Sequence, residues 1–236
     1  MKAILDGLVR NSKDLDVSAL IFPQICIGCS KTLNRNEEMI CLLCKHQLSY
    51  TDQWLAPDHG RSVFEGRVEV NRVISFLHYS KGGILQSMMK ELKYNGRKDI
   101  GIGLGEMLGK VLSQHGLFDG VDGMVAVPLH PAKMIRRGYN QSSMIIKGLR
   151  EHLDIPDMSH VLERTQFTPS QTRKNRYERF RNIDQVFNCT GQNMVRGLHI
   201  LLVDDVITTG STLEGCAHSL LQAGSKKVSV ATLVQA

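Results

Sequence analysis

The spacing of apolar residues differs between the two halves of the chain. In the first half, apolar positions recur at helical spacing over residues 84–92 and again over residues 104–111, which predicts two amphipathic helices. The first of these runs stops at the turn signal YNG. Before it, residues 68–80 alternate between apolar and polar, which predicts a strand or a hairpin. Residues 45–68 show no sustained period and are interpreted as a connector.

From residue 123 onward, short apolar runs alternate with helical patterns. The apolar runs at 124–127, 200–203 and 228–234 predict buried strands, and helical spacing at 144–153 and 213–221 predicts helices between them. Such alternation builds a parallel sheet with helices on both faces, and these sheets bind ligands at the carboxyl ends of their strands. The sequence therefore predicts an α/β fold whose functional residues follow the strands.

The composition is that of an ordinary globular protein, with 42% hydrophobic and 22% charged residues. No apolar run reaches the roughly 20 residues that a membrane-spanning helix requires. Charged residues also interrupt the N-terminal segment, where a secretory signal would be apolar. We therefore expect a cytoplasmic protein with no membrane insertion. The formal net charge of +6 favours partners that carry phosphates.

Four of the six cysteines lie in two Cys-x-x-Cys pairs, CIGC and CLLC, with eleven residues between them. In a chain without an export signal this spacing favours a metal over disulfides, and four thiolates complete the tetrahedral coordination of a structural Zn²⁺. Iron–sulfur ligation and redox-active dithiols are the alternatives. The other two cysteines, Cys189 and Cys216, are predicted to be buried thiols. The predicted zinc ligands are Cys26, Cys29, Cys41 and Cys44.

The stretch LLVDDVITTGST places two adjacent acids, Asp204 and Asp205, where the strand at 200–203 is expected to end. Residues 208–212 then form a loop before a helix, and the free N–H groups, hydroxyls and helix dipole of such a loop suit a phosphate. The two carboxylates would repel a phosphate, but they can accept hydrogen bonds from neighbouring hydroxyls of a sugar. The combination predicts a site for a ribose 5-phosphate.

The same stretch resembles, position by position, the phosphoribosyl pyrophosphate (PRPP) signature of type I phosphoribosyltransferases. The resemblance implies the fold of that family, a parallel sheet with helices on both faces. It further implies that the two acids contact the ribose 2- and 3-hydroxyls and that the loop holds the 5-phosphate. The residues so assigned are Asp204, Asp205, Thr208, Thr209, Gly210, Ser211 and Thr212.

This resemblance also implies a pyrophosphate loop after an earlier strand, and VAVPLHPAKMIRRGYNQ occupies that place. Its basic residues can neutralise a leaving diphosphate together with Mg²⁺. The alternative is a solvated basic start of a helix. The residues assigned to the loop are Leu129, His130, Lys133, Arg136 and Arg137.

A long polar segment, residues 164–182, lies between two predicted strands and sets many basic residues against the single acid Glu178. Such a segment is typical of a flexible lid over an active site. The alternative is a solvated or nucleic-acid-contacting arm, in which Tyr177 and Phe180 could stack on bases. The residues assigned to the lid are Gln171, Arg173, Arg176 and Arg179.

The arrangement as a whole resembles the ComF family, phosphoribosyltransferase-like proteins associated with natural competence. The stretches ALIFPQICIGC, MKELKYNG, VPLHPAKMIRRGYNQS and TPSQTRKNRYERFRN precede the PRPP loop in the order of that family, with Lys133 where the family more often has Arg. The resemblance implies a four-cysteine zinc module within residues 1–60 and a phosphoribosyltransferase domain over residues 61–236.

We therefore expect a PRPP-binding, phosphoribosyltransferase-like protein that acts in DNA uptake and transformation and handles single-stranded DNA. The implied cofactors are structural Zn²⁺ and Mg²⁺ with PRPP, and the implied partners are PRPP, single-stranded DNA, a competence helicase and recombination proteins. The alternative is an active glycosyltransferase of nucleotide metabolism, which passes the ribose 5-phosphate of PRPP to a nucleobase or an amine. The residues leave open whether turnover occurs.

Overall fold

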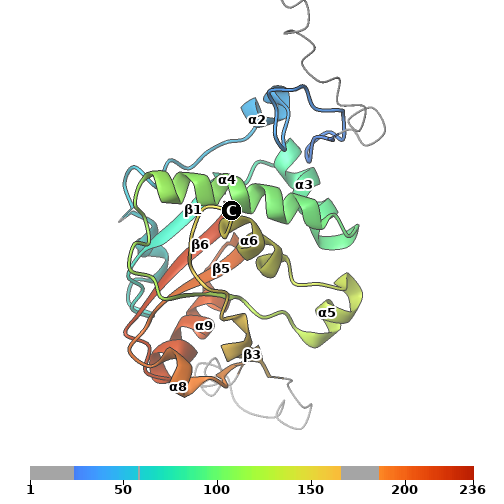
Figure 1. The fold of residues 1–236 in the computed structure, drawn as a ribbon. Helices are drawn as coiled ribbons and strands as arrows, with labels where there is room; N and C mark the ends of the chain where they lie inside the picture. The colour runs from blue at the N-terminus through green and yellow to red at the C-terminus, as the bar shows by residue number, and fades with distance from the viewer. Residues whose placement is uncertain (1–23, 58, 166–185) are drawn as a thin grey trace, which may run out of the picture.

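The computed structural model describes residues 24–57, 59–165 and 186–236 of the chain. Within these residues, a four-stranded parallel sheet with the order β1-β6-β5-β2 forms the centre of the molecule (Figure 1). Its strands are β1 (Val73–His78), β2 (Gly123–Ala126), β5 (His199–Ile207) and β6 (Lys227–Gln235). A short antiparallel pair, β3 (Leu162–Arg164) and β4 (Phe187–Cys189), lies outside this sheet. The predicted parallel α/β architecture is therefore confirmed.

Helices cover both faces of the sheet, with α3, α4 and α6 on one side and α9 on the other (Figure 1). Alternate residues of β5 point to opposite faces, so Leu201 packs with the first group of helices and Leu202 with α9. Both faces are apolar because a parallel sheet is buried on both sides. The helices are α2 (Leu42–His46), α3 (Ile84–Tyr94), α4 (Lys98–Gln114), α5 (Pro131–Arg137), α6 (Gln141–Leu149), α8 (Gln192–Val195) and α9 (Ser211–Gln222), with the 3-10 helices η1 (His59–Phe64) and η2 (Ser159–Val161).

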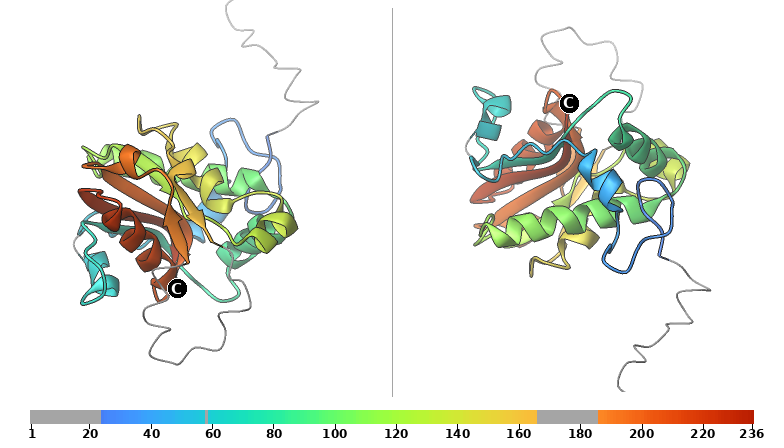
Figure 2. Two further views of the ribbon diagram at one scale, coloured as in Figure 1. Left: turned by 90° about the horizontal axis from the view of Figure 1, so that it is seen from below. Right: turned by 90° about the horizontal axis from the view of Figure 1, so that it is seen from above.

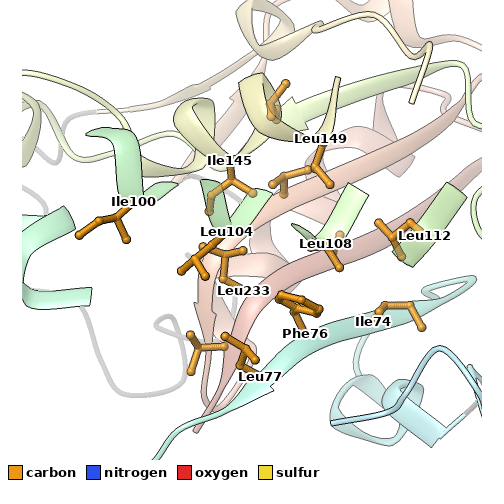
Figure 3. Close-up of a cluster of buried hydrophobic side chains, with 14 of the residues drawn as sticks. Ile74, Phe76, Leu77, Ile100, Leu104, Leu108, Leu112, Ile145, Leu149 and Leu233 are labelled. Carbon is orange, nitrogen blue, oxygen red and sulfur yellow. The ribbon is translucent and has the colours of Figure 1, made fainter. Parts of the chain in front are cut away.

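The larger core cluster lies between the sheet and α4. Leu104, Leu108 and Leu112 point from α4 toward Phe76 and Leu233 of the strands (Figure 3). Their spacing of four residues places them on one face of the helix. The helix predicted over residues 104–111 is thus part of α4. This cluster fixes α4 across the sheet.

Helices α4 and α6 pack closely because glycines line their contact. A Cβ atom added to Gly148 of α6 would lie 2.0 Å from the carbonyl oxygen of Ile102, and one added to Gly105 of α4 would lie 2.4 Å from the carbonyl oxygen of Ile145. A side chain at either position would displace backbone, so only glycine allows this separation. The start of α6 is thereby held beside the carboxyl end of β5.

Chain segments without regular structure cover both edges of the sheet. The N–H of Thr51 donates to the carbonyl of Phe76 in β1, and the N–H of Met158 donates to the carbonyl of Met124 in β2. The segment interpreted as a connector therefore pairs in part with the sheet, which shields an edge from association. The alternating run at 68–80 is a single strand, β1, rather than a hairpin.

The segment with the four cysteines packs on the side of the molecule that carries α3 and α4 (Figure 2). Cys26, Ile27 and Ile40 belong to the same buried cluster as α4, and Ile27 lies against Gly103 of that helix. The four-cysteine segment therefore shares its hydrophobic core with the remainder of the protein. A domain boundary at residue 60 stays a prediction.

Candidate functional site

The two adjacent acids lie within β5 rather than after it. The sequence predicts a strand over 200–203, but β5 continues to Ile207 because β6 offers backbone partners along its whole length, pairing Asp204 with Thr232 and Ile207 with Gln235. Asp204 and Asp205 therefore sit on a rigid strand near its carboxyl end. A strand positions a side chain more accurately than a loop does.

Asp204 is held from two directions. The Oγ of Ser142, in the first turn of α6, donates to its Oδ1 over 3.0 Å, and the N–H of Asp205 donates to the same oxygen over 2.9 Å. The pKa of Asp204 is raised to about 7, chiefly by burial and also by the neighbouring Asp205 carboxylate, while the two hydrogen bonds and Lys93 act in the opposite direction. A carboxyl group that titrates near neutral pH is typical of a functional site.

Asp205 forms an ion pair with a residue that the sequence analysis did not assign. The Nζ of Lys93, in the last turn of α3, lies 3.0 Å from the Oδ2 of Asp205. Lys93 lies in the stretch MKELKYNG. In the sequence, only the resemblance of this stretch to the ComF family pointed to a role for Lys93. The first predicted helix thus contributes a cation to the acids of the sheet.

The loop after β5 has the geometry of an anion site. Gly210 has a left-handed φ of 75° and precedes α9, whose N–H groups begin at Ser211. Residues 207–213 surround a small hollow of about 50 Å³ that also borders Asp204. Free N–H groups at the start of a helix and nearby hydroxyls favour a phosphate at such a place.

Arg67 braces this loop from outside. Its guanidinium donates to the carbonyl oxygen of Thr209 over 2.6 Å and forms an ion pair with Glu214 in the first turn of α9. No sequence pattern indicates this contact, because Arg67 comes from the segment before β1. The phosphate-type loop is therefore anchored by a distant part of the chain.

A larger cavity of about 270 Å³ opens beside the acids and joins several of the predicted residues. Four cationic side chains and two carboxylates line it, which leaves a surplus of positive charge suited to a polyanion. Its lining is formed by Lys93, Val127, Pro128, Leu129, Lys133, Arg137, Gln141, Ser142, Arg164, Asp204, Asp205, Val206, Thr208 and Thr212.

The residues assigned to the pyrophosphate loop divide into two groups. Leu129, Lys133 and Arg137 line the cavity. His130 instead caps α5 by accepting the N–H of Ala132 at Nδ1, and the guanidinium of Arg136 lies 5.5 Å from the ring centre of Tyr94. The structure thus brings together three of the five with the acids.

One N–H donor of Arg137 has no hydrogen-bond partner among the described residues. Its Nη1 donates to the Oε1 of Gln141 over 2.6 Å, while its buried Nε has no hydrogen-bond partner among the described residues. A buried donor without a partner costs free energy, so a ligand acceptor at this position would be favoured.

The four residues assigned to the lid, Gln171, Arg173, Arg176 and Arg179, lie outside the described residues. Arg164, just before that segment, lines the cavity, and its guanidinium lies 5.4 Å from the ring centre of Phe187. Arg164 was quoted within the basic stretch but was not among the residues assigned to the site.

The four N-terminal cysteines converge on one point. Their Sγ atoms all lie within 4.8 Å of one another, and those of Cys29 and Cys41 are 3.8 Å apart. Tetrahedral coordination with Zn–S bonds of about 2.3 Å imposes nearly this separation. The cluster could therefore hold a metal ion. The two remaining cysteines, Cys189 and Cys216, are buried as predicted.

The local electrostatics favour the thiolate of Cys26 but not that of Cys44. Burial opposes ionisation of Cys26, but backbone N–H groups, chiefly that of Cys41, lower its pKa to about 7. Burial and the neighbouring thiols raise the pKa of Cys44. Four thiolates cannot remain so close without a compensating cation, so the donor set fits a metal such as zinc.

Comparisons with known proteins agree with this geometry. Residues 141–236 match the family model of the phosphoribosyl transferase domain. The chain is 28% identical over 224 residues to the DNA utilization protein YhgH of Escherichia coli, which covers 89% of this chain and 96% of the relative. It is 33% identical over 116 residues to competence protein F of Haemophilus influenzae, which covers 49% of this chain and 51% of the relative.

Among solved structures, an allosteric regulatory enzyme of purine biosynthesis matches with a TM-score of 0.43 and 21% identity, over 61% of this chain and 29% of that longer one. The domain match and the sheet with its acids define a phosphoribosyltransferase-like protein with the type I fold. The chain is similar to proteins named for DNA utilization and for competence, and it carries a four-cysteine cluster, so the resemblance to the ComF family read from the sequence is confirmed. Among the described helices, none combines the length and hydropathy of a membrane span.

Proposed function

We propose that the protein binds PRPP at the carboxyl end of β5. The observation that carries this proposal is the convergence of two acids, a phosphate-type loop and four cationic side chains on two hollows that share Asp204 and Thr208 in their linings. A phosphate alone would not need Asp204 and Asp205, and a neutral sugar would not need the cations. A ribose that bears phosphate groups at both ends uses all three features.

Each part of PRPP has a matching group in the site. The carboxylates of Asp204 and Asp205 would accept hydrogen bonds from the ribose hydroxyls, and residues 208–212 would hold the 5-phosphate. Lys133 and Arg137 would contact the diphosphate. Mg²⁺ would be held by carboxylate and diphosphate oxygens, which it prefers as ligands, and would neutralise part of the diphosphate charge.

We propose further that this PRPP site serves DNA uptake, with single-stranded DNA handled by the same protein. The names of the relatives, a DNA utilization protein and a competence protein, support this role, and the net charge of +6 suits a nucleic-acid partner. The resemblance to the ComF family implies a competence helicase and recombination proteins as further partners, in the cytoplasm.

The metal of the four-cysteine cluster is proposed to be a structural Zn²⁺. Cys26, Cys29, Cys41 and Cys44 supply all four ligands of a tetrahedral ion, which leaves no position open for a substrate. The ion would hold a segment whose apolar residues join the main core. It therefore has no part in the chemistry at β5.

Calorimetric titration of the metal-replete protein with PRPP and Mg²⁺ tests the proposal, with a repeat in the presence of single-stranded DNA. We expect PRPP to bind with a Kd of about 1–100 µM. Replacing both acids (Asp204→Asn, Asp205→Asn) should weaken binding at least ~100-fold without unfolding the protein, because two charged acceptors are lost. The exposed Asp154→Asn is the matched control. Unchanged affinity in the double variant would refute the ribose assignment.

The alternative is catalytic transfer, which the surplus of cations beside the acids favours because it would stabilise a leaving diphosphate. In that reaction, the bond from C1 of the ribose to the diphosphate breaks, a nucleobase or amine forms a new bond to C1, and diphosphate leaves. Diphosphate release that depends on one particular acceptor would distinguish this function from binding alone.

A further inference from the structure

We propose that Lys93 is a PRPP-binding residue that exchanges its partner on binding, from Asp205 in the free protein to the diphosphate of the ligand. This inference deepens the proposed function and rests on it. The observation behind it is the ion pair between Lys93 Nζ and Asp205 Oδ2, which joins helix α3 to the acids of β5.

The position of Lys93 selects the diphosphate end of the ligand. The 5-phosphate hollow of about 50 Å³ is lined by residues of the loop after β5 and by Asp204. Lys93 instead lines the cavity of about 270 Å³, together with Lys133, Arg137 and Arg164. A ligand whose 5-phosphate occupies the smaller hollow must extend its other end into the larger one, where these cations lie.

Competition for Asp205 supplies the reason for the exchange. The ion pair is partly enclosed, with 23% of the Lys93 side chain and 13% of the Asp205 side chain exposed. When ribose hydroxyls or Mg²⁺ take the Asp205 carboxylate, the ammonium group loses its counter-charge in a place where an unpaired charge is unfavourable. A diphosphate in the same cavity would supply a new partner for it.

Lys93 can reach a new partner without a change in the fold. The lysine side chain has a flexible stem of four carbons and three donors on its ammonium group, so it can turn between neighbouring acceptors. The buried face of α3, formed by Leu85, Met88, Met89 and Leu92, stays in the core while the side chain of Lys93 moves.

The test compares Lys93→Met with the wild type for three probes: PRPP with Mg²⁺, inorganic diphosphate with Mg²⁺, and ribose 5-phosphate. We expect PRPP and diphosphate to bind about 10- to 100-fold more weakly, which is the usual effect of losing one charge-assisted hydrogen bond. Ribose 5-phosphate, which has no diphosphate, should bind at least as tightly as it does to the wild type, because no unpaired ammonium group is left when the ribose takes Asp205. Lys90→Met, an exposed lysine of the same helix, is the control and should change none of the three.

Lys93→Arg keeps the charge and should retain most of the affinity for diphosphate, which separates loss of the cation from damage to the fold. Unchanged binding of PRPP and diphosphate by Lys93→Met would overturn the assignment. So would an equal loss for ribose 5-phosphate, because Lys93 would then only hold Asp205 in place. A wild type that binds neither PRPP nor ribose 5-phosphate would instead overturn the proposed function, and the role of Lys93 with it.

Discussion

The two candidate sites of this protein draw their residues from the chain in different ways. The four cysteines lie within one stretch of nineteen residues, whereas the 270 Å³ cavity takes its lining from five separate segments: α3, the region from β2 to α5, the start of α6, the end of β3 and the end of β5. A single metal ion could hold the cysteine cluster together. The lining of the cavity comes together only when the core packs these segments against one another.

This difference predicts which property of the protein, stability or ligand binding, is lost when each site is disrupted. If the proposed metal is lost, the cysteine cluster should open, because its thiolates repel one another without a cation. A small displacement of α3 or α6 leaves every residue of the cavity present but moves Lys93 or Ser142 away from the acids. The first failure acts on stability, and the second acts on binding.

The largest effect is expected from removing the metal. Chelation, or Cys44→Ser, should reduce the bound metal from about one ion per chain to none and lower the free energy of unfolding by at least about 3 kcal/mol. The loss should extend beyond the cluster because Cys26, Ile27 and Ile40 lie in the main core. Metal analysis and thermal unfolding measure the two effects.

Cys189→Ala provides the control for the metal measurement, since this buried thiol lies away from the cluster in β4. It should keep the full metal content even if it lowers stability. A metal-free protein that unfolds at the same temperature as the metal-bound one would contradict a structural role for the ion.

The difference between a contiguous site and an assembled one also explains which functional residues could be predicted from the sequence. The cysteine ligands and the run from Asp204 to Thr212 are contiguous motifs, so their chemistry can be recognised without knowing the fold. Lys93 and Arg67 reach the site only through tertiary packing, and no spacing rule links them to β5. The end of β5 was also misjudged, because the length of its partner β6 decided it.

An intermediate effect is expected at the contact between α4 and α6, which lies between the two sites. Gly148→Ala would place a Cβ 2.0 Å from the carbonyl oxygen of Ile102 and should destabilise the fold by about 3 kcal/mol, since backbone must move. It should also weaken PRPP binding, because α6 carries Ser142, which donates to Asp204. Urea denaturation and calorimetry measure these effects.

Gly103→Ala in α4 is the matched comparison. Its Cβ would meet the ends of two flexible side chains, at 2.9 Å from Ile27 Cδ1 and 3.2 Å from Met39 Sδ, so we expect a change within about 1 kcal/mol. Equal effects of the two alanines would show that close approach of the backbones does not fix α6. Gly101, Gly105 and Gly109 repeat every fourth residue. This glycine repeat indicates close helix packing, but the prediction of the helix was based on apolar residues only.

The smallest effect is expected from the titration of Asp204. Its pKa is about 7 in the folded protein, against an ordinary value of 3.8. The folded state therefore holds this proton more tightly than the unfolded chain does, and protonation stabilises the fold at low pH. That contribution is complete below about pH 4 and is lost as the pH rises through 7.

Asp204→Asn removes the charge at every pH, so the stability of the variant relative to the wild type should increase by about 2–3 kcal/mol between pH 5 and pH 8. Urea denaturation at both pH values measures this difference, and Asp154→Asn should follow the wild type throughout. A difference that does not change between pH 5 and pH 8 would contradict the raised pKa. A gain in stability at pH 8 would mean that the free protein gives up stability to keep a carboxylate in place for its ligand. The cysteine cluster, if it holds the proposed metal, has no such cost, because its ligand is also what stabilises it.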